Sequence, residues 1–373
     1  MKLPLKGAID CDLHLPSPPT TALLHYLPPY WRDQMETRFI HKMNFQLTSY
    51  PPNSPLTCRE DWRPNKDESP LDQLRRQALD PFGLEIAVSS LLHGAIVLFN
   101  EDMAAALCSA VNDYVAHEWL DPEPRLRGSI LITGQNPDHA VAEIERLAHD
   151  SRFVQVILPV MGDMLPGKRQ MWPIYRACEK HGLALALHAG STYRFPTTAS
   201  GWPSFQVEDY VANSTGFENA IVSLLAEGVF SECPNLRVIC LESGFGWLPT
   251  LLWRVNKEWR GIRQEVPWID RPPADILRER FRFTLQPVEV PDAAMILRIL
   301  DHVGSDELLL FSTDYPHAHF EGEEALPEGL PEALIKKITR DNPLAAYPRL
   351  SGAWQAAGER ERLRPRHGAV DFR

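Results

Sequence analysis

The stretch "ELLLFSTDYPH", residues 307–317, joins an apolar run to a polar segment. The apolar run has the composition of a short strand that is covered on both faces, as in a parallel sheet. Asp314 and His317 follow this run directly. In parallel α/β barrels the catalytic side chains gather at the carboxyl ends of the strands. The stretch therefore predicts the last strand of such a sheet, with functional side chains at its end.

Seven more segments of the same apolar kind precede this one, and helical patterns separate them along the chain. Regular alternation of strands and helices is typical of parallel α/β folds, and eight strands predict a (β/α)8 TIM barrel. The predicted strands are 7–12, 84–90, 128–133, 153–158, 183–187, 236–241, 280–285 and 307–312. The predicted helices are 103–120, 137–150, 170–182, 210–230, 247–259 and 292–304, with a last one near 342–347 that begins with Asn342 as its N-cap.

Two segments exceed a minimal barrel, 15–82 and 190–205, and the second follows the fifth strand and should border the same mouth of the barrel. Residues 15–82 follow the first strand and are rich in proline and aromatic residues, as in "PPYWRD" (28–33). A connection this long is usually functional, so we expect a lid or an interface. Residues 1–350 are then one barrel domain, and 351–373 form a basic C-terminal tail.

Composition limits the classes of function. Of the 373 residues, 44% are hydrophobic and 23% are charged, which is typical of globular proteins, and the longest apolar runs are too short to cross a bilayer. The net charge of −11 opposes nucleic-acid binding. The six cysteines include no C-x-x-C pair, and the N-terminus lacks the features of a signal peptide. We expect a soluble cytoplasmic protein with reduced thiols.

Polar side chains end several of the predicted strands. Asp12 and His14 lie two residues apart on the first strand, so both point to the same side. His188 ends the fifth strand, Glu242 follows the sixth and Asp314 follows the eighth. Imidazoles and carboxylates together suit zinc, manganese or iron. The pattern predicts a divalent-metal site at the carboxyl end of the barrel.

Four other residues are candidates for substrate binding. Arg194, Tyr193 and Trp202 follow the fifth strand and offer a guanidinium fork and aromatic faces for a carboxylated, planar substrate. His93 follows the second strand. A core or loop role for His93, and packing of the other three against the insertion, are the alternatives.

Five motifs occur in order along the chain: "DCDLH" (10–14), "ALHAG" (186–190), "ESGFGWLP" (242–249), "STDYPH" (312–317) and "DNPLAAYPRL" (341–350). With them the sequence resembles the amidohydrolase superfamily over residues 7–350. The branch it resembles includes metal-dependent hydrolases and non-oxidative decarboxylases such as γ-resorcylate decarboxylase and aminocarboxymuconate semialdehyde decarboxylase. The resemblance implies one divalent ion held by Asp12, His14, His188 and Asp314.

Two departures from that family pattern bear on the reaction. The fourth strand continues "VILPVMG" (156–162) and lacks the lysine that bridges two ions in some relatives. Glu242 stands where decarboxylase relatives tend to carry a catalytic histidine. The resemblance implies that Asp314 moves a proton between water and leaving group. Glu242 is then a second acid/base or a ligand of a second ion, and with His317 the set has enough donors for two ions.

These features predict a divalent-metal-dependent hydrolase or non-oxidative decarboxylase acting on a small carboxylated aromatic or cyclic metabolite. Zinc or manganese is the expected ion, with iron as an alternative, and Glu242 favours hydrolysis. Two other functions stay open: a dinuclear iron or manganese oxygenase on the same scaffold, and a non-catalytic subunit that partners a paralogous chain. We expect a homo-oligomer, with a hetero-oligomer as the alternative.

Overall fold

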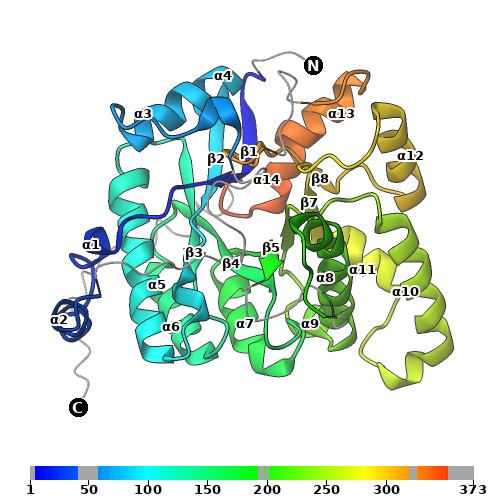
Figure 1. Ribbon diagram of the computed structural model, residues 1–373. Helices are drawn as coiled ribbons and strands as arrows, with labels where there is room; N and C mark the ends of the chain where they lie inside the picture. The colour runs from blue at the N-terminus through cyan, green and yellow to red at the C-terminus, as the bar shows by residue number, and fades with distance from the viewer. Residues whose placement is uncertain (1–4, 41–57, 192–197, 199–200, 319–325, 352–373) are drawn as a thin grey trace.

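The protein, as a computed structural model, is described here for residues 5–40, 58–191, 198, 201–318 and 326–351. Eight parallel strands form one sheet in the order β1 to β8, and helices surround it (Figure 1). Each predicted strand overlaps an observed one, so the (β/α)8 prediction is confirmed. The strands are β1 (Ala8–His14), β2 (Leu84–Ser90), β3 (Leu126–Leu131), β4 (Phe153–Met161), β5 (Ala184–Ser191), β6 (Val238–Leu241), β7 (Phe281–Thr284) and β8 (Leu309–Leu310).

The segment after β8 joins the last strand to the first. β8 itself is only two residues long, but the chain beyond it continues alongside β1. The Cys11 N–H donates to the Phe311 carbonyl at 2.9 Å, and the His14 N–H donates to the Tyr315 carbonyl at 2.7 Å. These bonds bring the two ends of the sheet together into a nearly closed barrel. The stretch 311–315 therefore closes the barrel and carries Asp314.

One helix, α12, shows both of the expected local signals, an N-cap side chain and a C-terminal glycine. α12 begins after Asp292, whose side chain accepts from the Met295 N–H at 2.8 Å, and ends at Gly304, which has a φ of 74°. The helices are α1 (Thr20–Leu23), α2 (Pro29–Thr37), α3 (Pro70–Leu74), α4 (Asp80–Phe82), α5 (Glu101–Val115), α6 (Pro137–Leu147), α7 (Trp172–Lys180), α8 (Gln206–Ala226), α9 (Val229–Glu232), α10 (Leu248–Ile262), α11 (Pro273–Arg280), α12 (Ala293–Val303), α13 (Glu332–Lys336) and α14 (Asn342–Ala346).

The prediction that Asn342 begins the last helix is wrong. α13, a π-helical turn (Lys337–Asp341) and α14 follow one another without a break, so Asn342 lies inside a longer helical segment. Its side-chain amide donates to the carbonyls of Asp306 and Leu309, each at 3.0 Å. Asn342 therefore ties this segment to β8, and its polar side chain serves tertiary contacts in place of a cap.

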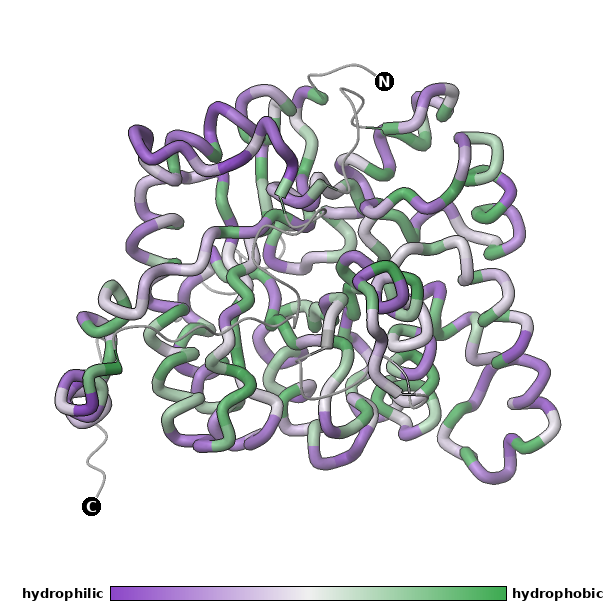
Figure 2. The backbone as a smooth tube through the Cα atoms, viewed as in Figure 1, coloured by the Kyte–Doolittle hydropathy of each residue, from purple (hydrophilic) through white to green (hydrophobic). Residues whose placement is uncertain are grey.

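The core lies in and around the barrel. The tube in Figure 2 is mostly apolar along the strands, whereas the helices carry both apolar and polar positions. The largest fully buried side chains include Tyr175, Tyr347, Phe153 and Phe281. Among the described residues, none of the helices is both long enough and apolar enough to cross a membrane.

In the insertion, α3 and α4 lie on the side of β1 and β2, whereas α1 lies beside α5 (Figure 1). Its residues 41–57 lie outside the described part of the chain, as does the basic tail beyond Ser351. Arg75, just after α3, donates to Glu123 Oε2 and to the Pro122 carbonyl, each at 2.8 Å. These bonds hold the second half of the insertion against the segment that precedes β3.

Candidate active site

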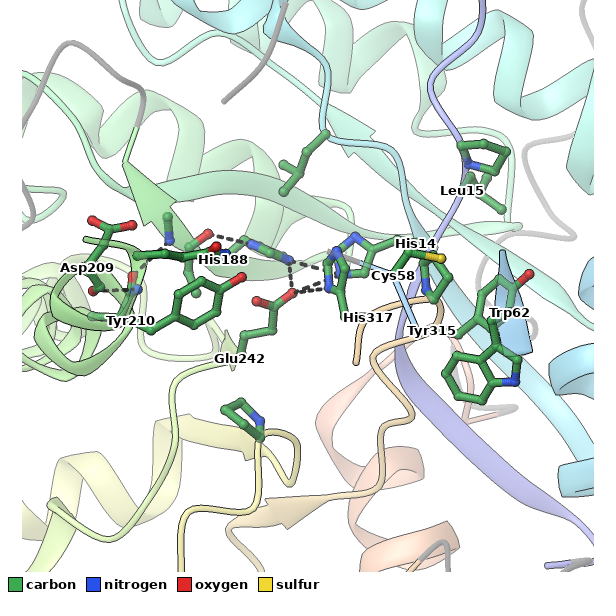
Figure 3. A pocket seen from close by; sticks show the side chains of 18 of the residues that line it. His14, Leu15, Cys58, Trp62, His188, Asp209, Tyr210, Glu242, Tyr315 and His317 are labelled. Atoms are coloured by element: carbon green, nitrogen blue, oxygen red, sulfur yellow. Dashed lines mark hydrogen bonds and ion pairs between the residues drawn. The ribbon is translucent and has the colours of Figure 1, made fainter. Parts of the chain in front are cut away.

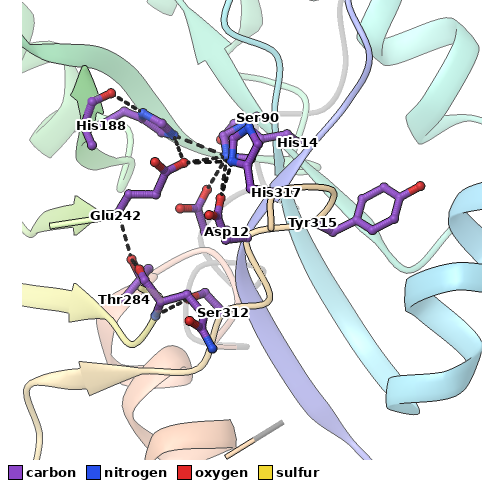
Figure 4. Close-up of polar contacts among 12 residues, drawn as sticks. Asp12, His14, Ser90, His188, Glu242, Thr284, Ser312, Tyr315 and His317 are labelled. Atoms are coloured by element: carbon purple, nitrogen blue, oxygen red, sulfur yellow. Dashed lines mark hydrogen bonds and ion pairs between the residues drawn. The ribbon is translucent and has the colours of Figure 1, made fainter. Parts of the chain in front are cut away.

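Six side chains from four strands meet at the carboxyl end of the barrel (Figures 3 and 4). They are three imidazoles and three carboxylates, and five of them are residues that the sequence places at strand ends. The sixth, His317, comes from the turn that follows β8. The six residues are Asp12, His14, His188, Glu242, Asp314 and His317.

His14 is at the centre of the cluster. Its Nε2 lies 2.9 Å from Glu242 Oε1 and 3.1 Å from Asp314 Oδ1. The same atom is 3.7 Å from Asp12 Oδ1 and 3.4 Å from His188 Nε2. Donor atoms from β1, β5, β6 and β8 thus converge on one small volume.

The other two imidazoles are held in defined orientations. His188 Nδ1 donates to the Ala189 carbonyl at 2.7 Å, which leaves Nε2, 3.1 Å from Glu242 Oε1, as the nitrogen that could bind an ion. His317 Nδ1 lies 2.8 Å from Asp314 Oδ1 and 3.5 Å from Glu242 Oε1. A backbone bond that fixes the tautomer is what metal-binding histidines usually have.

The surroundings of Asp12 show whether the cluster fits a metal ion. The residue is fully buried, yet neither of its carboxylate oxygens has a hydrogen-bond partner among the described residues. Buried carboxylates are otherwise paired or hydrogen-bonded, because burial of an unpaired charge costs several kcal/mol. A cation among Asp12, His14 and His188 would satisfy these oxygens.

The spacing of the donors fits the same conclusion. Two ligands that bind one ion at about 2.1 Å lie about 3.0–3.5 Å apart. The distances around His14 fall close to this range. Two overlapping groups of four donors keep their ligand atoms within 4.8 Å of one another, and both contain His14 and Glu242. One group adds Asp12 and His188, and the other adds Asp314 and His317.

Burial and charge act in opposite directions on the site carboxylates. Desolvation by burial raises the pKa of Asp12 to about 7. Burial also opposes the charge of Glu242, but His188 and hydrogen bonds from His14 outweigh it and hold the pKa of Glu242 well below its usual range. The cluster is therefore a dense set of coupled charges in a buried place, as functional sites often are.

The backbone at two of the carboxylates is strained. Glu242 and Asp314 both have a φ of 54°, in the left-handed region that side chains other than glycine rarely adopt. The Glu242 N–H donates to Thr284 Oγ1 at 2.9 Å, and the Asp314 N–H donates to the Asp12 carbonyl at 3.0 Å. Bonds to the neighbouring strands thus hold each strained residue in place.

Glu289 supports the loop that carries Glu242. Its carboxylate accepts from the N–H groups of Phe245 and Gly246, and so bridges the loop after β7 to the loop after β6. Gly244 has a φ of 63°, and a Cβ there would lie 2.2 Å from a Glu289 oxygen. The glycines of "ESGFGW" therefore make room for a carboxylate clamp that the sequence alone did not reveal.

A profile of the amidohydrolase family matches residues 9–349. The chain belongs to the amidohydrolase family. It is 26% identical over 258 residues to a γ-resorcylate decarboxylase of a Polaromonas species, a match that covers 65% of this chain and 76% of that protein. The γ-resorcylate decarboxylase of Rhodococcus jostii is 25% identical over 294 residues, covering 72% and 84%.

Solved structures show the same fold as this amidohydrolase. A 2,6-dihydroxybenzoate decarboxylase from Rhizobium has a TM-score of 0.62 at 19% identity, covering 92% of this chain and 99% of that one. A 5-carboxyvanillate decarboxylase from Novosphingobium aromaticivorans, determined with bound manganese, has a TM-score of 0.65 at 17% identity. That match covers 92% of this chain and 96% of the other.

The amidohydrolase cluster opens into one large cavity of about 780 Å³. His14, His188, Glu242 and His317 line it. Trp202, predicted to bind substrate, also lines the cavity and is 55% exposed. The cavity is within the usual size range of ligand-binding sites.

The remaining substrate-binding predictions have different outcomes. Tyr193 and Arg194 lie outside the described residues. His93 does not line the cavity. It is buried, its Nδ1 accepts from the Ala95 N–H at 3.1 Å, and burial lowers its pKa to about 4. The structure therefore brings Trp202 to the site but places His93 at the start of a 3₁₀ turn.

Two polar residues of this amidohydrolase were missed from the sequence. Tyr210 on α8 lines the cavity, and burial together with the nearby carboxylates of Glu242 and Asp314 raises the pKa of its hydroxyl. Its only signal in the sequence was its place at the start of the predicted helix 210–230. Asp10 lies two residues before Asp12 and binds the backbone of β1 and of the segment after β8. The spacing of two along the strand was its only signal.

Proposed function

We propose that this amidohydrolase is a divalent-metal-dependent decarboxylase that removes carbon dioxide from a carboxylated aromatic compound without oxidation. The observation that carries the proposal is the buried carboxylate of Asp12, which accepts no hydrogen bond from the described residues and lies beside the imidazoles of His14 and His188. The two γ-resorcylate decarboxylases, which match over most of their length, support decarboxylation as the reaction. Hydrolysis at the same site, which Glu242 favours, is the alternative.

Four residues would hold the ion: Asp12, His14, His188 and Asp314. Manganese is the proposed ion because structures of two related decarboxylases were determined with it, and zinc suits the same donors. When bound, the ion would act as a Lewis acid that stabilises negative charge on the oxygens of the substrate.

The protein must supply one proton per turnover. The bond between the ring carbon and the carboxylate carbon breaks, carbon dioxide leaves, and the ring carbon gains a proton. We assign the proton donor to His317, which lines the cavity and has its Nδ1 2.8 Å from Asp314 Oδ1. Asp314 orients this imidazole and stabilises its protonated form. Glu242, 3.5 Å from the same nitrogen, is the second acid/base group.

Metal analysis and carbon dioxide release test the proposal together. The protein purified without chelators should contain a divalent ion and release carbon dioxide from 2,6-dihydroxybenzoate or a related hydroxybenzoate. The His188→Ala variant should lose both the ion and the activity, whereas His302→Ala, an exposed residue of α12, should keep both. Metal-free protein that is fully active would overturn the proposal.

A second candidate is a dinuclear oxygenase, and one observation favours it. The two groups of four donors overlap, and Glu242 lies in both, where a carboxylate can bridge two ions. Two ions per chain with iron present, together with consumption of oxygen, would favour this function. One manganese or zinc per chain and no oxygen uptake would favour the decarboxylase.

The insertion, the assembly and the location complete the proposal. We propose that the insertion is a lid, since Trp62 and Leu74 from it line the cavity.

The apolar side chains of Phe205 and Val211 near the start of α8 are 69% and 73% exposed, which supports a homo-oligomer over a monomer. All six cysteines are unpaired, which supports a reducing cytoplasmic location.

A further inference from the structure

The cavity is much larger than one aromatic ring requires. A cavity of about 150 Å³ is enough to bind benzene. The cavity above the cluster measures about 780 Å³, roughly five times that volume. A substrate of one ring bound at the cluster would leave most of this space to water.

The cluster lies between two different walls of the cavity. Figure 3 shows Asp209 and Tyr210 of α8 on one side of the imidazoles and carboxylates, and Leu15, Cys58 and Trp62 on the other. A substrate whose carboxylate lies at the cluster can therefore extend toward either wall.

The wall on the side of the insertion is apolar. We call it the insertion wall and define it by five residues that line the cavity. Four of them are buried and the fifth, Leu92, is partly exposed. The residues are Leu15, Trp62, Leu74, Leu92 and Trp119.

Two polar side chains of the insertion that line the cavity are bonded within the fold. Both oxygens of Glu68 accept from Arg76, at 2.7 and 3.1 Å. The side-chain amide of Gln73 donates to the Asn65 carbonyl at 2.6 Å. None of the described residues that line the cavity is a lysine or an arginine. The described part of this wall offers apolar surface and no lysine or arginine for a second carboxylate.

The opposite wall has a different character. Gln206, Asp209, Tyr210 and Asn213 of α8 line it and carry hydrogen-bonding groups. Glu289 adds a second carboxylate to the lining. This wall suits hydroxyl groups of a substrate.

We propose that the substrate is a hydroxylated aromatic acid with a bulky uncharged substituent, of about the size of a second ring, that packs against the insertion wall. The inference rests on the proposed function, because it takes the carboxylate to lie at the cluster. Burial of a second ring against Trp62 and Leu92 removes apolar area from water, which favours the bound state. Two-ring acids should therefore bind more tightly than one-ring acids.

The test compares probes of two sizes on the full-length, manganese-loaded protein. The probes are 2-hydroxybenzoate and its 4-phenyl and 5-phenyl derivatives. Binding is measured by isothermal titration calorimetry, and turnover by release of carbon dioxide. At least one phenyl derivative should bind at least tenfold more tightly than 2-hydroxybenzoate and have a higher kcat/KM.

Leu92→Trp fills the insertion wall and sharpens the test. The ratio of the affinity for the better phenyl derivative to that for 2-hydroxybenzoate should fall at least tenfold in this variant. Leu297→Trp, the same substitution at an exposed position of α12, should leave that ratio unchanged and controls for the added indole.

The outcomes separate this inference from the proposed function. If the one-ring acid binds as well as both two-ring acids, or if Leu92→Trp leaves the affinity ratio unchanged, the size inference is wrong while decarboxylation can stand. If the two-ring acids bind more tightly but no carbon dioxide is released from any probe, the substrate inference holds for binding and the proposed reaction fails.

Discussion

Two aspartates on the same strand have opposite surroundings. Asp10 and Asp12 lie two residues apart on β1, and both are fully buried. Asp10 accepts three hydrogen bonds: from the Asp12 N–H at 3.1 Å, from the Thr313 N–H at 3.1 Å and from Thr313 Oγ1 at 2.6 Å. Asp12 accepts none from the described residues. The carboxylate of Asp10 is thus fully hydrogen-bonded to the segments around it, whereas the carboxylate of Asp12 is left to bind an ion.

The difference shows which observation identifies a ligand. Burial raises the pKa of both carboxyl groups to about 7, so the direction of the shift does not separate them. Hydrogen bonding separates the two carboxylates, because Asp10 accepts three hydrogen bonds and Asp12 accepts none from the described residues. We therefore assign Asp10 to positioning the segments that carry Asp12 and Asp314, and Asp12 to binding the ion.

The largest effect should come from Asp12→Ala. Loss of a direct ligand should weaken manganese binding at least 1000-fold, about 4 kcal/mol. The metal-free protein should become about 1 kcal/mol more stable, because a buried carboxylate that accepts no hydrogen bond from the described residues is removed. Titration calorimetry with manganese and urea unfolding in a chelator measure the two effects. Metal-free Asp12→Ala protein that is clearly less stable than the parent would place Asp12 with Asp10 as a structural residue.

The same substitution at Asp10 should act in the opposite way. Asp10→Ala leaves three buried donors without an acceptor, so the metal-free protein should lose about 3 kcal/mol of unfolding free energy. Asp10→Asn keeps an oxygen that can accept from Asp12 and Thr313, and should recover most of this loss. Urea unfolding of the three metal-free proteins measures the series. Equal stabilities would mean that the Asp10 bonds do not hold the two segments together.

The sequence predicted the barrel better than it predicted the roles of single residues. Apolar strand composition and the order of strand ends were sufficient to locate all eight strands and to bring His188 to the cluster, because barrel topology converts strand ends into neighbours. The same rules did not distinguish Asp10 from Asp12, since both lie on the same face of one strand. That distinction depends on Thr313, which is about 300 residues away in the chain.

Other features depend on contacts that local patterns do not contain. Asn342 followed by proline is a normal helix start, yet its amide binds the chain around β8 and the helix continues through it. The positive φ of Glu242 has no signature in its own residue type, because glutamate usually avoids that region. Its loop is held by Glu289, a residue in a different βα unit.

Glu123 extends the comparison to a buried carboxylate with cationic partners. Arg125 and Arg75 donate to it, and these bonds outweigh burial and lower its pKa to about 2. A folded-state pKa below the usual value means that the group stabilises the fold above about pH 4.5, and that this contribution is lost as the pH falls toward 2. Glu123→Gln should therefore cost about 2 kcal/mol at pH 6 and progressively less below pH 4.5. Urea unfolding of both proteins at pH 6, 4.5 and 3.5 tests this, and a constant difference over that range would contradict it.

The smallest expected effect concerns the strained backbone at Glu242. Glycine in an ordinary helix is less stable than alanine by about 0.5–1 kcal/mol. At residue 242, where φ is 54°, the order should reverse, and Glu242→Gly should be about 1 kcal/mol more stable than Glu242→Ala. Both variants lack the carboxylate, so their difference reports the backbone alone. The matched pair Glu258→Gly and Glu258→Ala, on the exposed face of α10, should show the usual order in the same urea unfolding measurements. If alanine is the more stable residue at both positions, residue 242 leaves the left-handed conformation once its carboxylate is gone, and the contacts of Glu242 within the cluster, more than the loop around it, impose the strain.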